Sequence, residues 1–486
     1  MSISRIIGRR FEKKILTQVY KSSEAEFIAV YGRRRVGKTF LIREFFENDI
    51  FFEIVGIYQA SLKEQLENFA YALGRAQNLK EKPQRPNSWM EAFNRLEKSL
   101  GKELKKQPLK KQVVFIDELP WFNGKRSNFL SNLDHFWNGW GVKQKNLILI
   151  VCGSAASWML QKIVNAKGGL HNRLTRRIRL LPFTLLESEE FFKSKKILLT
   201  RFQTAELYMA IGGIPYYLSL VTPGMSAAQN IDNLCFSTEG ALRDEYEKLL
   251  SSLFRNSKQH EAIIRILAQK KSGLTRKELI INLKVSSGGT ISRQLNELVE
   301  SGFIQAQIPF GNNSNNSLYK LTDEYCLFYL RWIEKLGKRN IDKGYWMSLQ
   351  NSSNHAAWAG FAFENLCIKH IRQLKDALGI SGVTTTHSPW RFIPKPNHDQ
   401  QGAQIDLLID RKDGTINICE MKFSQGLFTI TKQYAQTLRR KREVFRNITG
   451  TRKNLFITIV TSFGLSDNTW SGELITKTIT LEDIFK

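Results

Sequence analysis

The fold of this chain is decided at residues 27–40, which read Phe27-Ile28-Ala29-Val30-Tyr31-Gly32-Arg33-Arg34-Arg35-Val36-Gly37-Lys38-Thr39-Phe40. An apolar run ends in Gly-x-x-x-x-Gly-Lys-Thr, and apolar and charged residues then alternate at helical spacing. The pattern predicts a strand, a glycine-rich loop and a helix. Such a loop binds phosphate because its backbone N–H groups point inward and the helix N-terminus favours an anion. An ordinary glycine-containing turn is the alternative, which the complete pattern disfavours.

Two side chains of this loop have predicted chemical roles. Lys38 is expected to reach the β- and γ-phosphates of a nucleotide, and Thr39 to offer its hydroxyl to Mg²⁺, which prefers a few protein oxygens beside waters and phosphates. The expected cofactors are therefore ATP and Mg²⁺. The residues expected to contact the nucleotide are Gly32, Arg33, Arg34, Arg35, Val36, Gly37, Lys38, Thr39 and Phe40, with Ser154 from a later strand.

A second apolar run, Val113 to Ile116, ends in the acids Asp117 and Glu118. A buried parallel strand delivers such residues at its carboxyl edge. Asp117 is expected to hold hydrated Mg²⁺. Glu118 is expected to orient or deprotonate the attacking water, so that Lys38 and Glu118 are the predicted catalytic residues of ATP hydrolysis. A solvated turn is the alternative for the acid pair. Ser154 either senses the γ-phosphate or caps the following helix.

The composition predicts a polyanionic partner. The 486 residues contain 72 Lys plus Arg against 45 Asp plus Glu, which gives a formal net charge of +27. DNA is the expected partner, and solvated basic helix faces are the alternative. The five cysteines form no Cys-x-x-Cys pair, so neither a disulfide framework nor a zinc site is indicated. With no secretion signal and no uninterrupted apolar span, we expect a soluble cytoplasmic protein without membrane contact.

The nucleotide motifs, together with Gly8-Arg9-Arg10-Phe11-Glu12 and Gly212-Gly213-Ile214-Pro215-Tyr216-Tyr217, resemble archaeal-type ATPases of the STAND branch, which are relatives of AAA+ proteins. The resemblance covers about the first half of the chain. It implies an α/β P-loop NTPase with Walker A and Walker B motifs, a parallel sheet and a helical lid. The basic segment 171–179 could supply a cation to a neighbouring subunit's nucleotide, which would make the protein a homo-oligomer. A solvated or DNA-facing strand is the alternative.

Three helical segments and a polar hairpin follow the expected lid, and their order predicts a winged helix-turn-helix. If this module contacts DNA, its third helix would present the four polar side chains of Thr290, Arg293, Gln294 and Asn296. A connector between domains is the alternative.

The last region contains a second candidate site. Residues 402–410 and 415–423 flank the turn Asp413-Gly414 and predict a hairpin. Glu420 and Lys422 share a face of the second strand, and Asp406 lies on the first. Asp406 and Glu420 are therefore expected to hold Mg²⁺ while Lys422 stabilises a scissile phosphate.

This arrangement resembles the PD-(D/E)xK nuclease superfamily and the DUF234-type tail of many archaeal-type ATPases. The resemblance implies that Glu364, Asp406, Glu420 and Lys422 form a catalytic set, although Ile405 stands where the superfamily's name has proline. A degenerate nuclease fold used for docking or DNA binding is the alternative.

The predicted organisation is a P-loop ATPase core (1–186), a helical lid (187–255), a winged helix-turn-helix (256–325) and an α/β nuclease-like domain (326–486). The predicted function is an ATP-binding and ATP-hydrolysing molecular switch coupled to a DNA-binding or DNA-cleaving C-terminal domain. The alternative is an ATP-dependent signalling or regulatory scaffold whose nuclease-like tail is catalytically inert.

Overall fold

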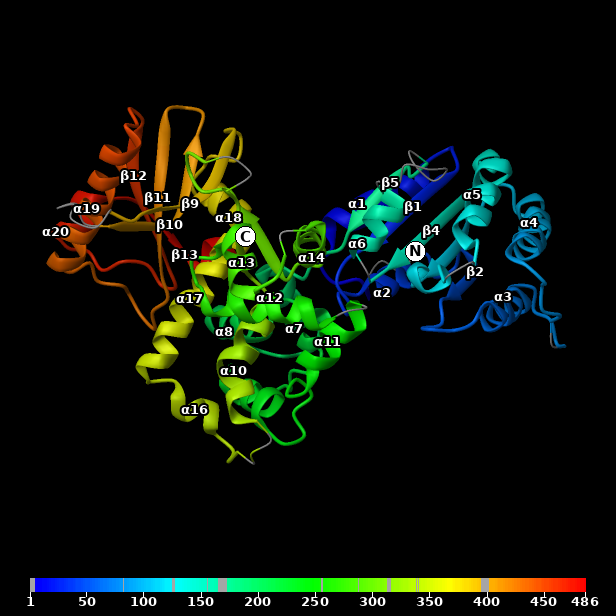
Figure 1. Cartoon of the computed structure of the whole chain (residues 1–486), viewed down its shortest axis with the longest axis horizontal. Coiled ribbons are helices and arrows are strands. Elements are labelled where there is room, and N and C mark those ends of the chain that lie inside the picture. Colours follow the sequence, from blue (N-terminus) through cyan, green and yellow to red (C-terminus); the bar gives the residue numbers. More distant parts are fainter. Residues whose placement is uncertain are drawn as a thin grey trace. The chain divides into compact units, whose positions relative to one another are not determined.

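The computed structural model describes residues 5–81, 83–124, 127–154, 156–164, 173–254, 257–286, 288–312, 316–337, 339, 341–394 and 402–486. The chain divides into two compact units, Met1–Pro182 and Phe183–Lys486 (Figure 1). No helix among the described residues is both long enough and apolar enough to cross a membrane.

The N-terminal unit is built on a five-stranded parallel sheet with the order β2-β3-β4-β1-β5. Its strands are β1 (Glu26–Tyr31), β2 (Ile50–Val55), β3 (Gln112–Asp117), β4 (Leu147–Gly153) and β5 (Arg176–Arg179). Every residue of β1, β3 and β4 is buried, because a parallel sheet that is covered on both faces has apolar side chains at successive positions. The predicted α/β class with a parallel sheet is confirmed.

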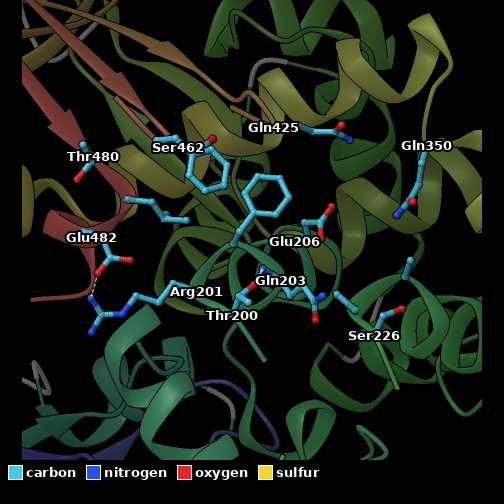
Figure 2. Close-up of a pocket in the computed structure, with 15 residues that line it drawn as sticks. Thr200, Arg201, Gln203, Glu206, Ser226, Gln350, Gln425, Ser462, Thr480 and Glu482 are labelled. Atoms are coloured by element: carbon cyan, nitrogen blue, oxygen red, sulfur yellow. Dashed lines mark hydrogen bonds and ion pairs between the residues drawn. The ribbon is translucent and has the colours of Figure 1, made fainter. Parts of the chain in front are cut away.

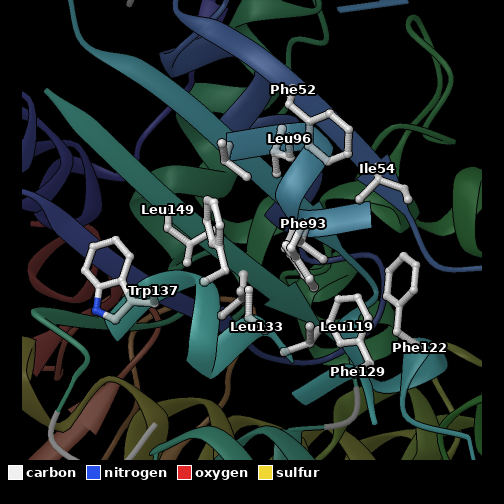
Figure 3. Close-up of a cluster of buried hydrophobic side chains, with 14 of the residues drawn as sticks. Phe52, Ile54, Phe93, Leu96, Leu119, Phe122, Phe129, Leu133, Trp137 and Leu149 are labelled. Carbon is white, nitrogen blue, oxygen red and sulfur yellow. The ribbon is translucent and has the colours of Figure 1, made fainter. Parts of the chain in front are cut away.

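The α-helices among the described residues of this unit are α1 (Arg10–Lys21), α2 (Lys38–Phe45), α3 (Leu62–Ala76), α4 (Trp89–Lys106), α5 (Phe129–Gly139) and α6 (Ala156–Met159). Side chains of α4 and α5, among them Phe93 and Leu133, pack on one face of the sheet beside Phe52 and Leu149 (Figure 3). This close packing fixes the strands, and with them the loops at their carboxyl ends.

The C-terminal unit begins with α7 (Leu185–Ser194), α8 (Arg201–Ile211), α9 (Pro215–Leu218), α10 (Ala227–Ile231) and α11 (Glu245–Leu253). The glycine-rich turn lies between α8 and α9. Gly212 ends α8 with φ 71°. Gly213 accepts a 2.7 Å hydrogen bond from the Phe183 N–H, and a Cβ on Gly213 would lie 2.1 Å from the Phe183 oxygen. Glycine is therefore required here because two backbone segments are in contact.

Next come α12 (Ser257–Gln269), α13 (Arg276–Leu283) and α14 (Gly289–Glu300), with a small antiparallel sheet of order β6-β8-β7. Its strands are β6 (Leu274–Thr275), β7 (Ile304–Gln307) and β8 (Leu318–Leu321). The elements follow the predicted order, and the assignment of a winged helix stays a prediction. The prediction that the third helix, α14, would present Gln294 to DNA is corrected. Gln294 is 5% exposed, and its amide donates a hydrogen bond to Gln259 of α12. Gln294 packs inside the helical bundle and is not presented to solvent.

The α-helices described between β8 and the second large sheet are α15 (Glu324–Phe328), α16 (Tyr345–Leu349), α17 (Ser353–Lys369) and α18 (Ile371–Ala377). The sheet has the order β13-β12-β11-β10-β9. Its strands are β9 (Thr385–Phe392), β10 (Ala403–Arg411), β11 (Thr415–Lys422), β12 (Asn454–Thr461) and β13 (Ile475–Thr480). The helices α19 (Lys432–Thr449), α20 (Thr469–Leu474) and α21 (Leu481–Ile484) follow β11, β12 and β13. Strands β10 and β11 form the predicted hairpin, with Gly414 at φ 81°. Strands β11, β12 and β13 run parallel.

Candidate functional sites

The predicted phosphate loop lies between β1 and α2, at the carboxyl edge of the parallel sheet. Gly32 has φ 152°, and a Cβ there would lie 2.2 Å from the Leu180 oxygen. Arg35 and Gly37 have φ 70° and 90°, and Gly37 caps α2. These left-handed conformations curl the backbone ahead of the helix, whose first N–H groups have no partner within the helix.

Lys38 lies at the centre of this curl. Its Nζ donates 3.0 Å hydrogen bonds to the carbonyl oxygens of Gly32 and Arg33, and the residue is 6% exposed. Phosphate oxygens are stronger acceptors for an ammonium group than neutral carbonyl oxygens are. The loop therefore holds the lysine where an anion could exchange with its present partners.

Thr39, at the start of α2, meets Asp117, at the end of β3, although β4 lies between β3 and β1, the strand that precedes α2. The Thr39 hydroxyl donates a 2.5 Å hydrogen bond to Oδ2 of Asp117, which is 3% exposed. A hydroxyl and a carboxylate fit Mg²⁺, which takes its other ligands from water and phosphate. No three His, Cys, Asp or Glu side chains are grouped as a metal site among the described residues.

Glu118 turns away from Asp117 because its backbone is left-handed, with φ 48° and ψ 47°. One of its carboxylate oxygens, Oε2, accepts hydrogen bonds from the Ser154 hydroxyl at 2.9 Å and the Ser154 N–H at 3.3 Å. The structure thus brings Glu118 and Ser154 together at the ends of neighbouring strands. The helix-cap alternative for Ser154 involves Ala155, which lies outside the described residues.

The other predicted contact residues contribute unequally. Arg34 and Phe40 are exposed, Phe40 by 51%, whereas Arg33 and Val36 are buried. Buried Val36 and solvent-facing Phe40 offer a phosphate their backbone N–H groups and no side-chain donor. The arginines of β5 are exposed beside buried Ile178, which fits both alternatives for this segment, and His171 lies outside the described residues.

Arg9 supports the loop in a way that sequence patterns did not identify. Its guanidinium donates hydrogen bonds to the Val36 oxygen at 2.9 Å and the Leu181 oxygen at 2.6 Å, and the residue is 5% exposed. It therefore connects the loop to the chain segment that follows β5. The Gly8-Arg9 motif is the only sequence feature that singles out Arg9, and it does not reveal the contacts with Val36 and Leu181, which lie far along the chain.

Cys152 of β4 stays a neutral thiol, because burial and the charge of Asp117 raise its pKa.

In the C-terminal unit, Glu364 lies on α17, Asp406 on β10, and Glu420 and Lys422 on β11. Burial raises the pKa of Glu364, and the negative charges of Asp406 and Glu420 raise it further, so the three carboxylates share one environment. Lys422 faces the same side as Glu420, since its Nζ lies 4.9 Å from the ring centre of Tyr434, which donates a 3.3 Å hydrogen bond to Glu420.

Two further lysines pair with these carboxylates. Lys320 of β8 forms an ion pair with Glu364, and Lys441 of α19 donates to Oε1 of Glu420 at 2.6 Å. Both oxygens of Glu420 are therefore engaged, one by Lys441 and one by Tyr434. The Mg²⁺ site that was expected at Asp406 and Glu420 stays a prediction, and binding a metal there would require Glu420 to exchange at least one of these partners. Lys320 belongs to no local motif, and Lys441 lies in a basic run of α19 whose sequence does not reveal its pairing with Glu420.

Comparisons with known proteins found a family model that matches the N-terminal part and a relative that matches most of the chain. Residues 7–221 match the model of an ATPase domain found predominantly in Archaea. An uncharacterized protein of Methanocaldococcus jannaschii is 24% identical over 404 residues, 83% of this chain and 83% of that protein. An uncharacterized ATP-binding protein of the same organism is 44% identical over 46 residues, 10% of this chain and 78% of that protein. A solved Walker-type ATPase of Pyrococcus abyssi has a TM-score of 0.48 and 20% identity, with 68% of this chain and 97% of that chain covered.

Proposed function

We propose that this chain is a molecular switch that binds and hydrolyses ATP, and the match of residues 7–221 to the model of an ATPase domain found predominantly in Archaea supports the proposal. The observation that carries the proposal is the 2.5 Å contact between Thr39 of the loop and Asp117 at the end of β3. This contact brings together, at the carboxyl edge of the sheet, the hydroxyl and the carboxylate that would bind the Mg²⁺ of a Mg²⁺–nucleotide complex.

Each residue of the N-terminal site has one task in this proposal. Lys38 exchanges its carbonyl partners for phosphate oxygens, and Thr39 and Asp117 hold the metal, which neutralises phosphate charge when it is bound. Glu118 orients the attacking water and accepts its proton, while Ser154 fixes the direction of the Glu118 carboxylate. This division of tasks is supported by the separate orientations of the two neighbouring acids.

ATP hydrolysis by the full-length protein tests this proposal. Lys38→Ala is expected to abolish binding and hydrolysis, and Glu118→Gln to bind ATP but hydrolyse it at least 100-fold more slowly, as is typical for the loss of a general base (about 10²-fold or more). Lys14→Ala is the matched control, because Lys14 is an exposed residue of α1. Hydrolysis in Lys38→Ala at the wild-type rate would refute the assignment.

For the C-terminal unit, we propose that it binds DNA under the control of the ATP site. The net charge of +27 and the residues Arg440 and Arg442 of α19 support a phosphate-backbone contact. Arg439 and Lys441 of the same basic run pair with Glu473 and Glu420. The runner-up function is a scaffold with an inert tail. Glu364 pairs with Lys320, and Glu420 pairs with Lys441. These ion pairs favour DNA binding without cleavage over DNA cleavage.

Measurements of duplex DNA binding and of plasmid cleavage distinguish an ATP-controlled DNA-binding protein from a nuclease and from a scaffold. We expect DNA affinity to fall steeply with salt, because phosphate contacts release counterions, and to differ between ATP-bound protein and Lys38→Ala. Cleavage with Mg²⁺ or Mn²⁺ that Lys422→Ala abolishes would instead establish a nuclease. Absence of DNA binding at low salt, with ATP hydrolysis intact, would leave the scaffold function.

A further inference from the structure

A cavity of about 570 Å³ lies within the C-terminal unit, beside the carboxyl ends of three parallel strands. The chain segments that leave β11, β12 and β13 place Gln425, Ser462 and Thr480 in its wall (Figure 2). Helix α8 provides another wall. Open α/β sheets bind ligands in the crevice outside the carboxyl ends of their parallel strands, and a volume of roughly 300–1,000 Å³ is typical of small-molecule sites. None of the four predicted nuclease-like residues lines this cavity.

The charges of the cavity wall disfavour an anion. Three charged side chains line it, namely Arg201, Glu206 and Glu482, so acids outnumber bases in a chain that is otherwise strongly basic. Arg201 is already neutralised: its Nε donates to Glu189 at 3.0 Å, and its Nη1 pairs with Glu482. The dashed line in Figure 2 marks the Glu482 contact.

The carboxylate of Glu206 indicates which kind of ligand the cavity could bind. Among the residues that the structure describes, none forms a hydrogen bond or ion pair with its carboxylate. Burial raises its pKa to about 7. His355 lies with Glu206 in the wall of a smaller adjoining cavity, but burial lowers the pKa of His355, which therefore offers no compensating charge near neutral pH. A partly buried, uncompensated carboxylate is costly, and a cation would offset that cost.

Aromatic and amide side chains complete the lining. Phe202 of α8 stacks between Phe423 and Phe463, with ring centres 4.8 and 5.2 Å away, and Phe463 is 46% exposed. The amides of Gln203, Gln350 and Gln425 supply neutral acceptors. Exposed ring edges and faces suit an alkyl stem or a cation, and amide oxygens accept from its N–H groups.

We propose that this cavity binds a small organic cation, a primary amine or guanidine on an alkyl chain, with Glu206 as its counter-ion and the Phe202–Phe463 wall against its stem. This site is separate from the nucleotide loop, and the inference does not rest on the proposed ATPase function. The ligand is a free small molecule, because the cavity volume is that of a small-molecule site.

Equilibrium dialysis of the full-length protein with radiolabelled agmatine, which carries both an amine and a guanidine, tests the proposal. We expect saturable binding at pH 8 with one equivalent per chain, and competition by 1,4-diaminobutane but not by 1,4-butanediol. Glu206→Gln should weaken binding at least tenfold. Glu239→Gln is the matched control, since Glu239 is an exposed acid outside the cavity, and it should bind as the wild type does.

A second variant separates loss of the site from loss of the fold. Ala228→Leu narrows the cavity without changing a charge and should also weaken agmatine binding, while both variants retain the wild-type circular dichroism spectrum and ATP hydrolysis. The proposal is overturned if wild-type protein takes up no agmatine, or if folded Glu206→Gln binds it with wild-type affinity. Equal competition by 1,4-butanediol would overturn it too, because recognition would then not depend on charge.

Discussion

The hydroxyl of Ser154 donates a 2.9 Å hydrogen bond to Oε2 of Glu118, joining the ends of β4 and β3. A hydrogen bond to a charged group contributes about 1.5–3 kcal/mol, enough to hold a side chain in one direction. We therefore expect Ser154→Ala to reduce kcat for ATP hydrolysis about tenfold, with KM nearly unchanged, because about 1.4 kcal/mol of transition-state stabilisation corresponds to tenfold in rate. Steady-state kinetics check this, with exposed Ser194→Ala as the control. A wild-type kcat in Ser154→Ala would contradict the orienting role.

Thr39 should control the metal requirement, because its hydroxyl is hydrogen-bonded to Asp117 in the predicted site. Thr39→Val keeps the shape of the side chain but removes this oxygen, and we expect half-maximal hydrolysis to need at least tenfold more Mg²⁺. Thr39→Ser retains the oxygen and should stay within about threefold of wild type, a loss below ~0.7 kcal/mol. Titration of hydrolysis against Mg²⁺ gives both values. Equal Mg²⁺ dependence in Thr39→Val and Thr39→Ser would remove Thr39 from the metal site.

The two loop glycines should respond differently to alanine. At Gly32 a Cβ would lie 2.2 Å from the Leu180 backbone oxygen, whereas at Gly37 no atom lies within 4 Å. Gly37→Ala therefore costs only the strain of φ 90°, about 1–2 kcal/mol, while Gly32→Ala must also displace the segment after β5 and should cost more than about 3 kcal/mol. Chemical unfolding measures both. Equal destabilisation would show that the contact with Leu180 does not limit this position.

The sequence predicted what local patterns encode. The loop between β1 and α2, the acids that end β3 and the β10–β11 hairpin each lie within a short segment whose spacing reveals its geometry. The contacts of Arg9 with Val36 and of Lys320 with Glu364 were not predicted, because the partners lie 27 and 44 residues apart in the sequence. Gln294 was wrongly expected to face solvent, because packing against α12 decides which side of α14 is buried. The positions of these contacts depend on tertiary packing and not on local pattern.

Glu206 should make stability depend on pH. Its pKa of about 7 lies above the ordinary 4.5, so the folded state binds this proton more tightly than the unfolded state does. The resulting stabilisation is complete below pH 4.5 and is lost as pH rises towards 7, by about 3 kcal/mol. Relative to wild type, Glu206→Gln should therefore gain stability progressively over this range. Urea unfolding of both proteins between pH 5 and pH 8 checks this, and a constant difference would contradict it.

Lys320 and Glu364 connect β8 to α17, and each depends on the other for charge compensation. Lys320 is 6% exposed and the Glu364 side chain 17%, so removing one partner leaves a poorly solvated charge. Lys320→Met should destabilise the protein by about 3 kcal/mol, as is usual when a buried pair is broken. The double variant Lys320→Met, Glu364→Gln should recover much of that loss, because no unpaired charge remains. Urea unfolding of the two single variants and the double variant gives the coupling energy, expected at about 1–3 kcal/mol. Additive losses would mean that Lys320 does not neutralise Glu364 in solution, and the carboxylate would then be available to another cation.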